Sequence, residues 1–109
     1  MIEIDNQRLR NLTTGILHTD VDYVYQDLEL ILGQEGLMTH MLPNALKAII
    51  PWLKLNVTEE RFWNDEFDTE HTGNYSIPEP TGGERRVMWQ EYYSLDCPLF
   101  GKNVVGVVM

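Results

Sequence analysis

Residues 21–32 carry a helical repeat that leaves this stretch few alternative structures. Its apolar side chains recur at intervals of three and four, which places them along one face of an α-helix. They are Val21, Val24, Leu28, Ile31 and Leu32. A second repeat covers residues 42–53, with apolar side chains at Leu42, Leu46, Ile49, Ile50 and Leu53. Two amphipathic helices joined by a short connection predict an antiparallel helix pair.

The ends of both helices are marked by residues that start or stop helices. Thr19 or Asp20 can cap the first helix, with Asp22 as the acid of a capping box. Gly33 or Gly36 can end it in the left-handed conformation.

The second helix is expected to begin around Leu42 or Pro43, because proline is favoured in a first turn. Pro51 lacks an N–H group, so a kink or an end is expected there.

The rest of the chain predicts a small sheet around this pair. Residues 9–17 are interpreted as a strand, with Gly15 at a bulge, and residues 58–70 as a short acidic helix capped by Thr58. Residues 71–86 are rich in Gly and Pro and predict a long loop. Two C-terminal strands are expected at residues 85–93 and 103–109. The prediction is one α+β domain over residues 1–109.

The charge of the chain restricts its partners. Seventeen acidic and eight basic residues give a net charge of −9 over 109 residues. Such a chain is repelled by nucleic acid and by anionic membranes, and it is suited to a basic protein surface. The alternative is that the charge serves solubility alone. The lone Cys97, the absence of a signal peptide and the lack of a long apolar run predict a soluble intracellular protein.

Histidines offer the first candidate reactive groups. His40 follows Thr39 in the predicted connection between the helices, and it can bind a metal or move a proton, or only complete the loop's hydrogen bonds. His18, Asp20 and Asp22 alternate as metal ligands can, but both acids are better explained as helix-start residues. No nucleophile–base pattern accompanies them. We therefore predict no catalytic residue, no metal and no cofactor, and an enzyme is the least favoured class.

A glycine pair offers a possible phosphate site. Gly82 and Gly83 precede Arg85 and Arg86, so backbone N–H groups and two guanidinium groups can face an anion. A turn between extended segments is the competing interpretation. The functional alternative is a small-ligand or signalling-nucleotide binding protein, which is expected to work as a homodimer.

An acidic and aromatic block is the preferred binding surface. Residues 59–70 hold six acids against Arg61 alone, and Phe62, Trp63 and Phe67 lie among them. Buried aromatic anchors within a charged rim are what an interface requires. The competing interpretation places the three rings in the core. The predicted partner-binding residues are Glu59, Glu60, Trp63, Asp65, Glu66, Asp68 and Glu70.

Two short motifs resemble a family of short, mostly uncharacterised proteins of tailed bacteriophages, over about residues 9–55. That family has a strand with a Thr-Gly-Arg-Leu-like motif and a helix start with a Phe-Thr-His-x-Leu-Pro-like motif. The matching positions here are Thr14, Gly15 and Leu17, then Thr39, His40, Leu42 and Pro43. Ile16 replaces the usual basic residue and Met38 the aromatic one. The resemblance implies a phage protein working in the bacterial cytoplasm.

By analogy with other small acidic phage proteins, the expected function is inhibition of a host defence protein, as an anti-CRISPR protein or a similar inhibitor would act. The expected means is an acidic surface that mimics nucleic acid and meets a basic groove of the host protein. Such a protein makes no direct contact with nucleic acid or membrane.

Overall fold

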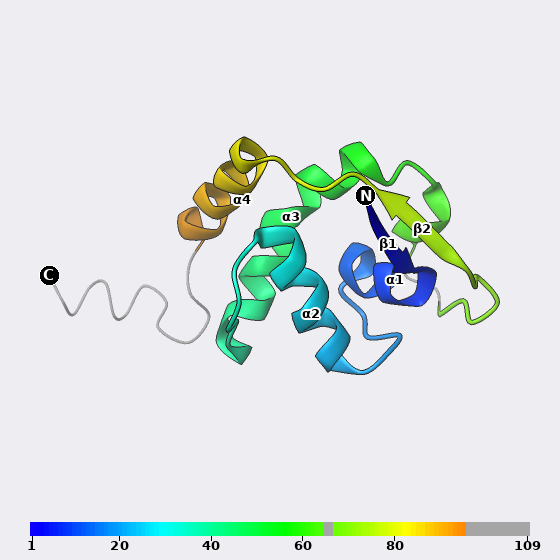
Figure 1. Cartoon of the computed structure of the whole chain (residues 1–109). Coiled ribbons are helices and arrows are strands. Elements are labelled where there is room, and N and C mark those ends of the chain that lie inside the picture. The colour runs from blue at the N-terminus through cyan, green and yellow to red at the C-terminus, as the bar shows by residue number, and fades with distance from the viewer. Residues whose placement is uncertain (65–66, 96–109) are drawn as a thin grey trace, which may run out of the picture.

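The computed structural model describes residues 1–64 and 67–95. Over these residues the chain forms four α-helices, two short 3₁₀ turns and a two-stranded antiparallel sheet (Figure 1). The elements are β1 (Ile2–Asp5), α1 (Asn6–Thr14), α2 (Val21–Leu32), η1 (Thr39–Met41), α3 (Leu42–Asn56), η2 (Glu60–Trp63), β2 (Asn74–Ile77) and α4 (Gly82–Ser94). The α+β class is confirmed. The strand expected at residues 103–109 lies outside the described residues.

The sheet joins the N-terminus to a segment that was expected to be loop. Strand β1 pairs antiparallel with β2, so that Ile2 lies opposite Ile77 and Ile4 opposite Tyr75. Successive side chains of a strand point to opposite faces, and Ile2, Ile4 and Ile77 are all buried against the core. The long loop predicted for residues 71–86 therefore contains a strand.

The strand predicted at residues 9–17 is wrong, because most of this stretch is helix α1. The Asp5 carboxylate accepts the backbone N–H groups of Gln7 and Arg8 and so caps the helix start. Leu9 and Leu12, one turn apart, are both buried. Gly15 has a φ of 73° and ends the helix instead of forming a bulge.

Helix α2 follows the prediction closely. Gly33 adopts a φ of 71° and donates its N–H to the Glu29 carbonyl, which is a left-handed helix end. Asp20 occupies the cap position, but its side chain makes no capping hydrogen bond, so the expected capping box with Thr19 is not formed.

The connection to α3, rather than α3 itself, runs antiparallel to α2. The Glu29 carboxylate accepts the N–H groups of Gly36 and Leu37, and Thr39 bonds the hydroxyl of Tyr25 in the first half of α2. Helix α3 thus begins beside the start of α2, and the two helices cross while running in the same general sense (Figure 1). The predicted antiparallel pair is wrong for this reason.

Helix α3 begins at Leu42 as expected, with proline in its first turn. It continues through Pro51 to Asn56, so of the kink or end expected at the proline the end is wrong, and the kink stays a prediction. The Pro51 side chain is exposed, which keeps its ring and its missing N–H on the solvent side of the helix. Ile49 and Leu53 of the predicted apolar stripe are fully buried.

The strand predicted at residues 85–93 is also wrong, because these residues lie in helix α4. Thr81 and Glu84 form a capping box: the Thr81 hydroxyl accepts the Glu84 N–H, and the Glu84 carboxylate accepts the Thr81 N–H. Met88 is the buried residue of this helix. The acidic helix expected from Thr58 is only the single turn η2, and Thr58 does not cap it.

One apolar core holds these elements together. It is formed by α1, α2 and α3, with the sheet and η2 closing it at one end and α4 covering the other (Figure 1). Residues with no exposed surface come from most of these elements, among them Leu9, Leu28, Ile49, Phe62 and Ile77.

Candidate functional site

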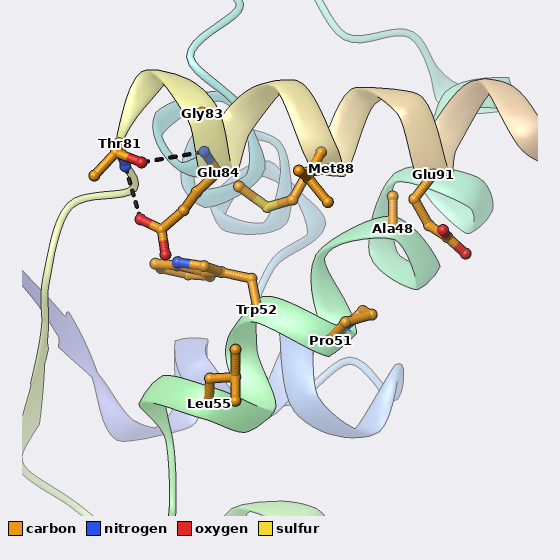
Figure 2. A pocket seen from close by; sticks show the side chains of 10 residues that line it. Ala48, Pro51, Trp52, Leu55, Thr81, Gly83, Glu84, Met88 and Glu91 are labelled. Carbon is orange, nitrogen blue, oxygen red and sulfur yellow. Dashed lines mark hydrogen bonds between the residues drawn. The ribbon is translucent and has the colours of Figure 1, made fainter.

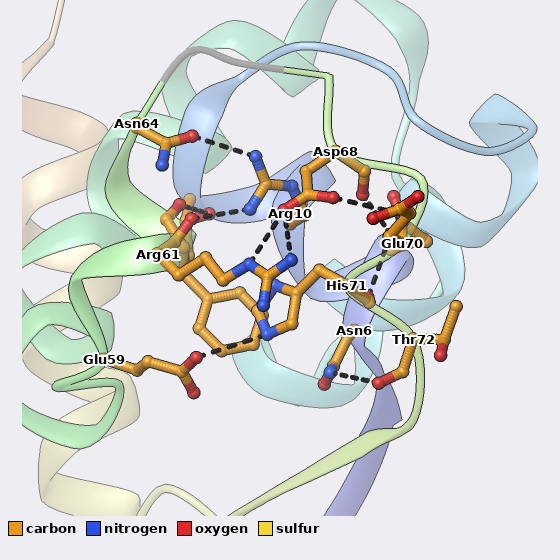
Figure 3. A network of polar contacts seen from close by, with 12 residues as sticks. Asn6, Arg10, Glu59, Arg61, Asn64, Asp68, Glu70, His71 and Thr72 are labelled. Carbon is orange, nitrogen blue, oxygen red and sulfur yellow. Dashed lines mark hydrogen bonds and ion pairs between the residues drawn. The ribbon is translucent and has the colours of Figure 1, made fainter.

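The acidic segment, residues 59–72, is bound to helix α1 through a buried arginine (Figure 3). Arg10 has no exposed surface. Its guanidinium group donates to the Arg61 carbonyl at 2.6 Å and to Asn64 Oδ1 at 3.0 Å. A buried charge is costly unless it is hydrogen-bonded, so Arg10 fixes this part of the segment against α1.

Polar side chains of α1 hold the rest of the segment by its backbone. The Gln7 amide donates to the carbonyls of Asp68 and His71, at 2.7 and 2.9 Å. The Asn6 amide donates to the Thr72 carbonyl at 3.0 Å, and the Thr13 hydroxyl donates to the Phe62 carbonyl. Residues 59–64 and 67–72 of the segment therefore have a defined path although they contain little regular structure.

Two of the predicted partner-binding acids contact basic side chains of the protein itself. The Arg61 guanidinium group bonds Asp68 with an Nε–Oδ2 distance of 2.8 Å, and this hydrogen bond lowers the pKa of the Asp68 carboxyl. Glu59 Oε1 lies 3.3 Å from Nε2 of the buried His71.

The other acids of the segment are placed differently. Glu60 and Glu70 are exposed, and neither makes an ion pair among residues 1–64 and 67–95. Asp65 and Glu66 lie outside the described residues.

The three aromatic rings of the segment have different environments. Phe62 is fully buried, as the core interpretation expected. Trp63 is half-buried, and its indole N–H donates to the Val57 carbonyl at 2.9 Å. Phe67 is 58% exposed and stacks on the His18 ring with centroids 4.1 Å apart. Of the three rings Phe67 is therefore the most exposed, while the predicted Trp63 is half-buried.

Four of the five arginines bond other groups of the protein. Arg8 pairs with Asp27 at 2.5 Å, Arg10 and Arg61 belong to the network above, and Arg85 donates to two carbonyls of α2. The exposed carboxylates consequently have few basic neighbours to neutralise them.

A large apolar groove lies between α3 and α4, away from the acidic segment (Figure 2). Its volume is about 470 Å³, and it is lined by Ala48, Pro51, Trp52, Leu55, Thr81, Gly83, Glu84, Val87, Met88 and Glu91. The sequence interpretation missed this groove because it assigned residues 85–93 to a strand. The Thr81-x-x-Glu84 capping box was the signal that could have found α4.

A second pocket of about 330 Å³ lies beside α1 and carries basic groups. Lys47 and Lys54, both on α3, line it together with Trp63, and the Lys54 ammonium group lies 5.7 Å from the centre of the indole ring. Neither lysine makes an ion pair in the described part of the chain.

The proposed phosphate loop takes another form. Gly82 and Gly83 are the first residues of α4. The Arg85 side chain donates to the Ile31 and Leu30 carbonyls at 3.1 and 3.2 Å, while Arg86 is exposed. The two arginines therefore do not converge on one anion.

The histidines are separated from one another. His40 lies in the η1 turn, and His18 lies between α1 and α2 against Phe67. Burial, followed by the nearby charge of Arg10, lowers the pKa of His18. Within residues 1–64 and 67–95, no three side chains of His, Cys, Asp or Glu converge as metal ligands do. No described helix has the length and apolar composition required to cross a membrane.

Comparison with known proteins gives the family of the chain. Residues 5–63 match the model of a domain of unknown function, DUF7736. This segment is more than half of the 109 residues, and the protein belongs to that family. It includes the lysine pocket and all of α3, but not β2 or α4. No curated protein and no solved structure matches the chain.

Proposed function

We propose that this protein is not an enzyme and acts by binding a basic surface of another protein. The observation that carries the proposal is the distribution of charge: four of the five arginines bond groups of the protein itself, while carboxylates such as Glu60 and Glu70 remain exposed and unpaired within the described residues. Phe67, exposed in the same segment, supplies an apolar contact. Complementary charge speeds and orients the encounter with a basic partner, and an aromatic anchor adds affinity.

The proposed partner is a host protein whose basic groove normally holds nucleic acid. This part rests on the net charge of −9 and on the resemblance to tailed-bacteriophage proteins. The protein would then act in the bacterial cytoplasm as an inhibitor of a host defence complex, occupying the groove as a mimic of nucleic acid. In this role it touches neither nucleic acid nor membrane.

The test compares two double charge reversals with equal net charge. Glu60→Lys with Glu70→Lys changes the acidic segment but leaves the Arg61–Asp68 and Glu59–His71 pairs in place. Glu35→Lys with Glu79→Lys changes exposed acids elsewhere. Tagged proteins are used to capture partners from bacterial lysate at about 50 and 300 mM salt, and the captured protein is quantified.

The expected result is capture at low salt that falls steeply at high salt, because screening weakens exposed charge contacts. The Glu60/Glu70 variant should lose capture by roughly tenfold or more, as two interfacial charge contacts would require. Equal capture by both variants would exclude the acidic segment as the docking surface. Failure to capture any partner in a salt-sensitive way would exclude the proposal.

The lysine pocket favours one alternative function, which is binding of a small organic anion. Lys47 and Lys54 can hold an anionic group while Trp63 contacts an aromatic body. Calorimetry against a panel of cyclic nucleotides tests this alternative. Nucleotide binding should be lost in the Lys47→Ala, Lys54→Ala double variant and kept in Arg86→Ala. If no nucleotide gives a heat of binding, this alternative function is excluded.

A further inference from the structure

The groove between α3 and α4 exposes apolar side chains on both of its walls. Leu55 of α3 is 78% exposed and Val87 of α4 is 62% exposed, while Met88 forms a buried part of the lining. The lining positions 84, 87, 88 and 91 recur at helical spacing, so the groove follows two turns of α4, about 10 Å of helix. Figure 2 shows the side chains of the two helices facing one another across it.

Trp52 in this groove has a hydrogen-bond donor without an acceptor. The side chain is only 5% exposed, and its indole nitrogen is buried with no partner among the described residues. The other two tryptophans are satisfied: Trp63 donates to Val57, and Trp89 donates to the Leu32 carbonyl at 3.0 Å. A buried N–H without an acceptor destabilises a protein, and a molecule seated in the groove can supply one when the Trp52 ring turns toward it.

The charged groups along the groove are both acidic. Glu84 and Glu91 lie seven residues apart on α4, and the lining includes no lysine or arginine. One oxygen of Glu84 accepts the Thr81 N–H, and its carboxylate still contributes negative charge to the rim. Apolar walls with a negative rim are complementary to a helix that has an apolar face and basic flanks.

We infer that the α3–α4 groove binds a basic amphipathic helix of a partner protein. Apolar side chains of that helix, spaced by three, four and seven residues, lie against Leu55, Val87 and Pro51. Its lysine or arginine side chains pair with Glu84 and Glu91, and Trp52 turns so that a polar atom of the helix accepts its N–H. The inference rests on the proposed function, because both require a basic partner, but it assigns the contact to a different surface.

The test follows the three indole N–H signals of the full-length protein by ¹⁵N NMR. The probe is an 18-residue synthetic helix with leucine on one face and lysine on the other. A peptide of the same composition in scrambled order is the control. The Trp52 signal, assigned with Trp52→Phe, should shift with the amphipathic peptide, while the Trp63 and Trp89 signals remain nearly unchanged because their acceptors are internal.

Matched substitutions identify the surface. Val87→Asp and Leu55→Asp should each weaken peptide binding by about tenfold or more, since a carboxylate would be buried against the apolar face of the peptide. Val21→Asp, at an exposed site on α2, should change it little. Glu91→Lys should weaken binding by about threefold to fivefold relative to Glu35→Lys, which has the same net charge.

Three results would overturn the inference. The first is that the amphipathic peptide binds without shifting the Trp52 signal, or binds the Val87→Asp variant as tightly as the unmodified protein. The second is a Trp52 signal that already changes with protein concentration, which would mean that a second copy fills the groove. The third is no binding by the amphipathic peptide. Partner capture that depends on Glu60 and Glu70 would survive any of them, so failure here is distinguishable from failure of the proposed function.

Discussion

Helices α1 and α4 begin in the same way and are attached to the protein in opposite ways. Each starts with a side-chain cap, provided by Asp5 and Thr81. Helix α1 is then enclosed, with buried polar side chains bonded to a segment about 60 residues further along the chain. Helix α4 buries Met88 as its single fully enclosed side chain and leaves Val87 exposed. Local sequence forms the helix, but tertiary contacts decide whether its faces remain open to a partner.

The largest expected effect comes from breaking the enclosure of α1. Arg10→Met removes the buried guanidinium group that donates to the Arg61 carbonyl and to Asn64 Oδ1. Both acceptors then lose this hydrogen-bond donor. The free energy of unfolding should fall by roughly 3–5 kcal/mol. Urea unfolding followed by circular dichroism measures the change, with exposed Arg86→Met as the control. A loss below about 1 kcal/mol would mean that the network adds little to the attachment of α1.

A smaller and more local effect is expected at α4. Arg85→Met removes two hydrogen bonds to the last turn of α2, and we expect a loss of about 1–2 kcal/mol. Native-state hydrogen exchange should become faster in α4 and at the end of α2, while α1 is unaffected. Faster exchange throughout the protein would contradict a separate, weaker attachment of α4.

Two glycines sharpen the comparison further. Both Gly15 and Gly33 have positive φ, so alanine should cost about 1 kcal/mol at either site. A Cβ at Gly33 would also lie 2.9 Å from Cδ of Arg85, whereas a Cβ at Gly15 meets nothing within 4 Å. Gly33→Ala should therefore cost about 0.5–1 kcal/mol more than Gly15→Ala. The excess should disappear in an Arg85→Ala background, which has no atom at the δ position, and its persistence there would assign the excess to the backbone alone.

The smallest expected effect is an opposite pH dependence at two ion pairs. Burial raises the pKa of Asp27 above its ordinary value, outweighing the hydrogen bond and charge of Arg8. The folded state therefore holds this proton more tightly, and stability from Asp27 is lost as pH rises through the raised pKa. The pKa of Asp68 is lowered by Arg61, so its contribution is lost as pH falls through the lowered value.

Unfolding measured between about pH 3 and 6 distinguishes the two groups. In the unmodified protein, Asp27 lowers the free energy of unfolding as pH rises, and this trend should be absent in Asp27→Asn. Asp68 lowers it as pH falls, and that trend should be absent in Asp68→Asn. The same trend in both variants would contradict the assigned causes.

The sequence predicted the elements whose apolar spacing is regular. The stripe from Val24 to Leu32 gave α2 with its glycine end, and the proline at position 43 marked the start of α3. Residues 85–93 were misassigned because alternate residues can suit either a strand or a helix. The correct assignment depended on the Thr81–Glu84 capping box.

The candidate sites were less predictable because they depend on contacts between distant segments. The acidic character of residues 59–70 was visible in sequence, but not the Arg61–Asp68 pair or the burial of Phe62. The groove required the position of α4 on α3, and the lysine pocket required α1 and α3 to lie side by side. No local pattern contains that information.

The hydrogen bonds from α4 to the end of α2 have a consequence for synthesis on the ribosome. The Leu30, Ile31 and Leu32 carbonyls receive their side-chain donors from Arg85 and Trp89. A nascent chain can form α2 soon after it emerges, but these carbonyls stay bonded to water until more than fifty further residues have been added. During translation the C-terminal half of α2 therefore lacks these hydrogen bonds until α4 has emerged from the ribosome.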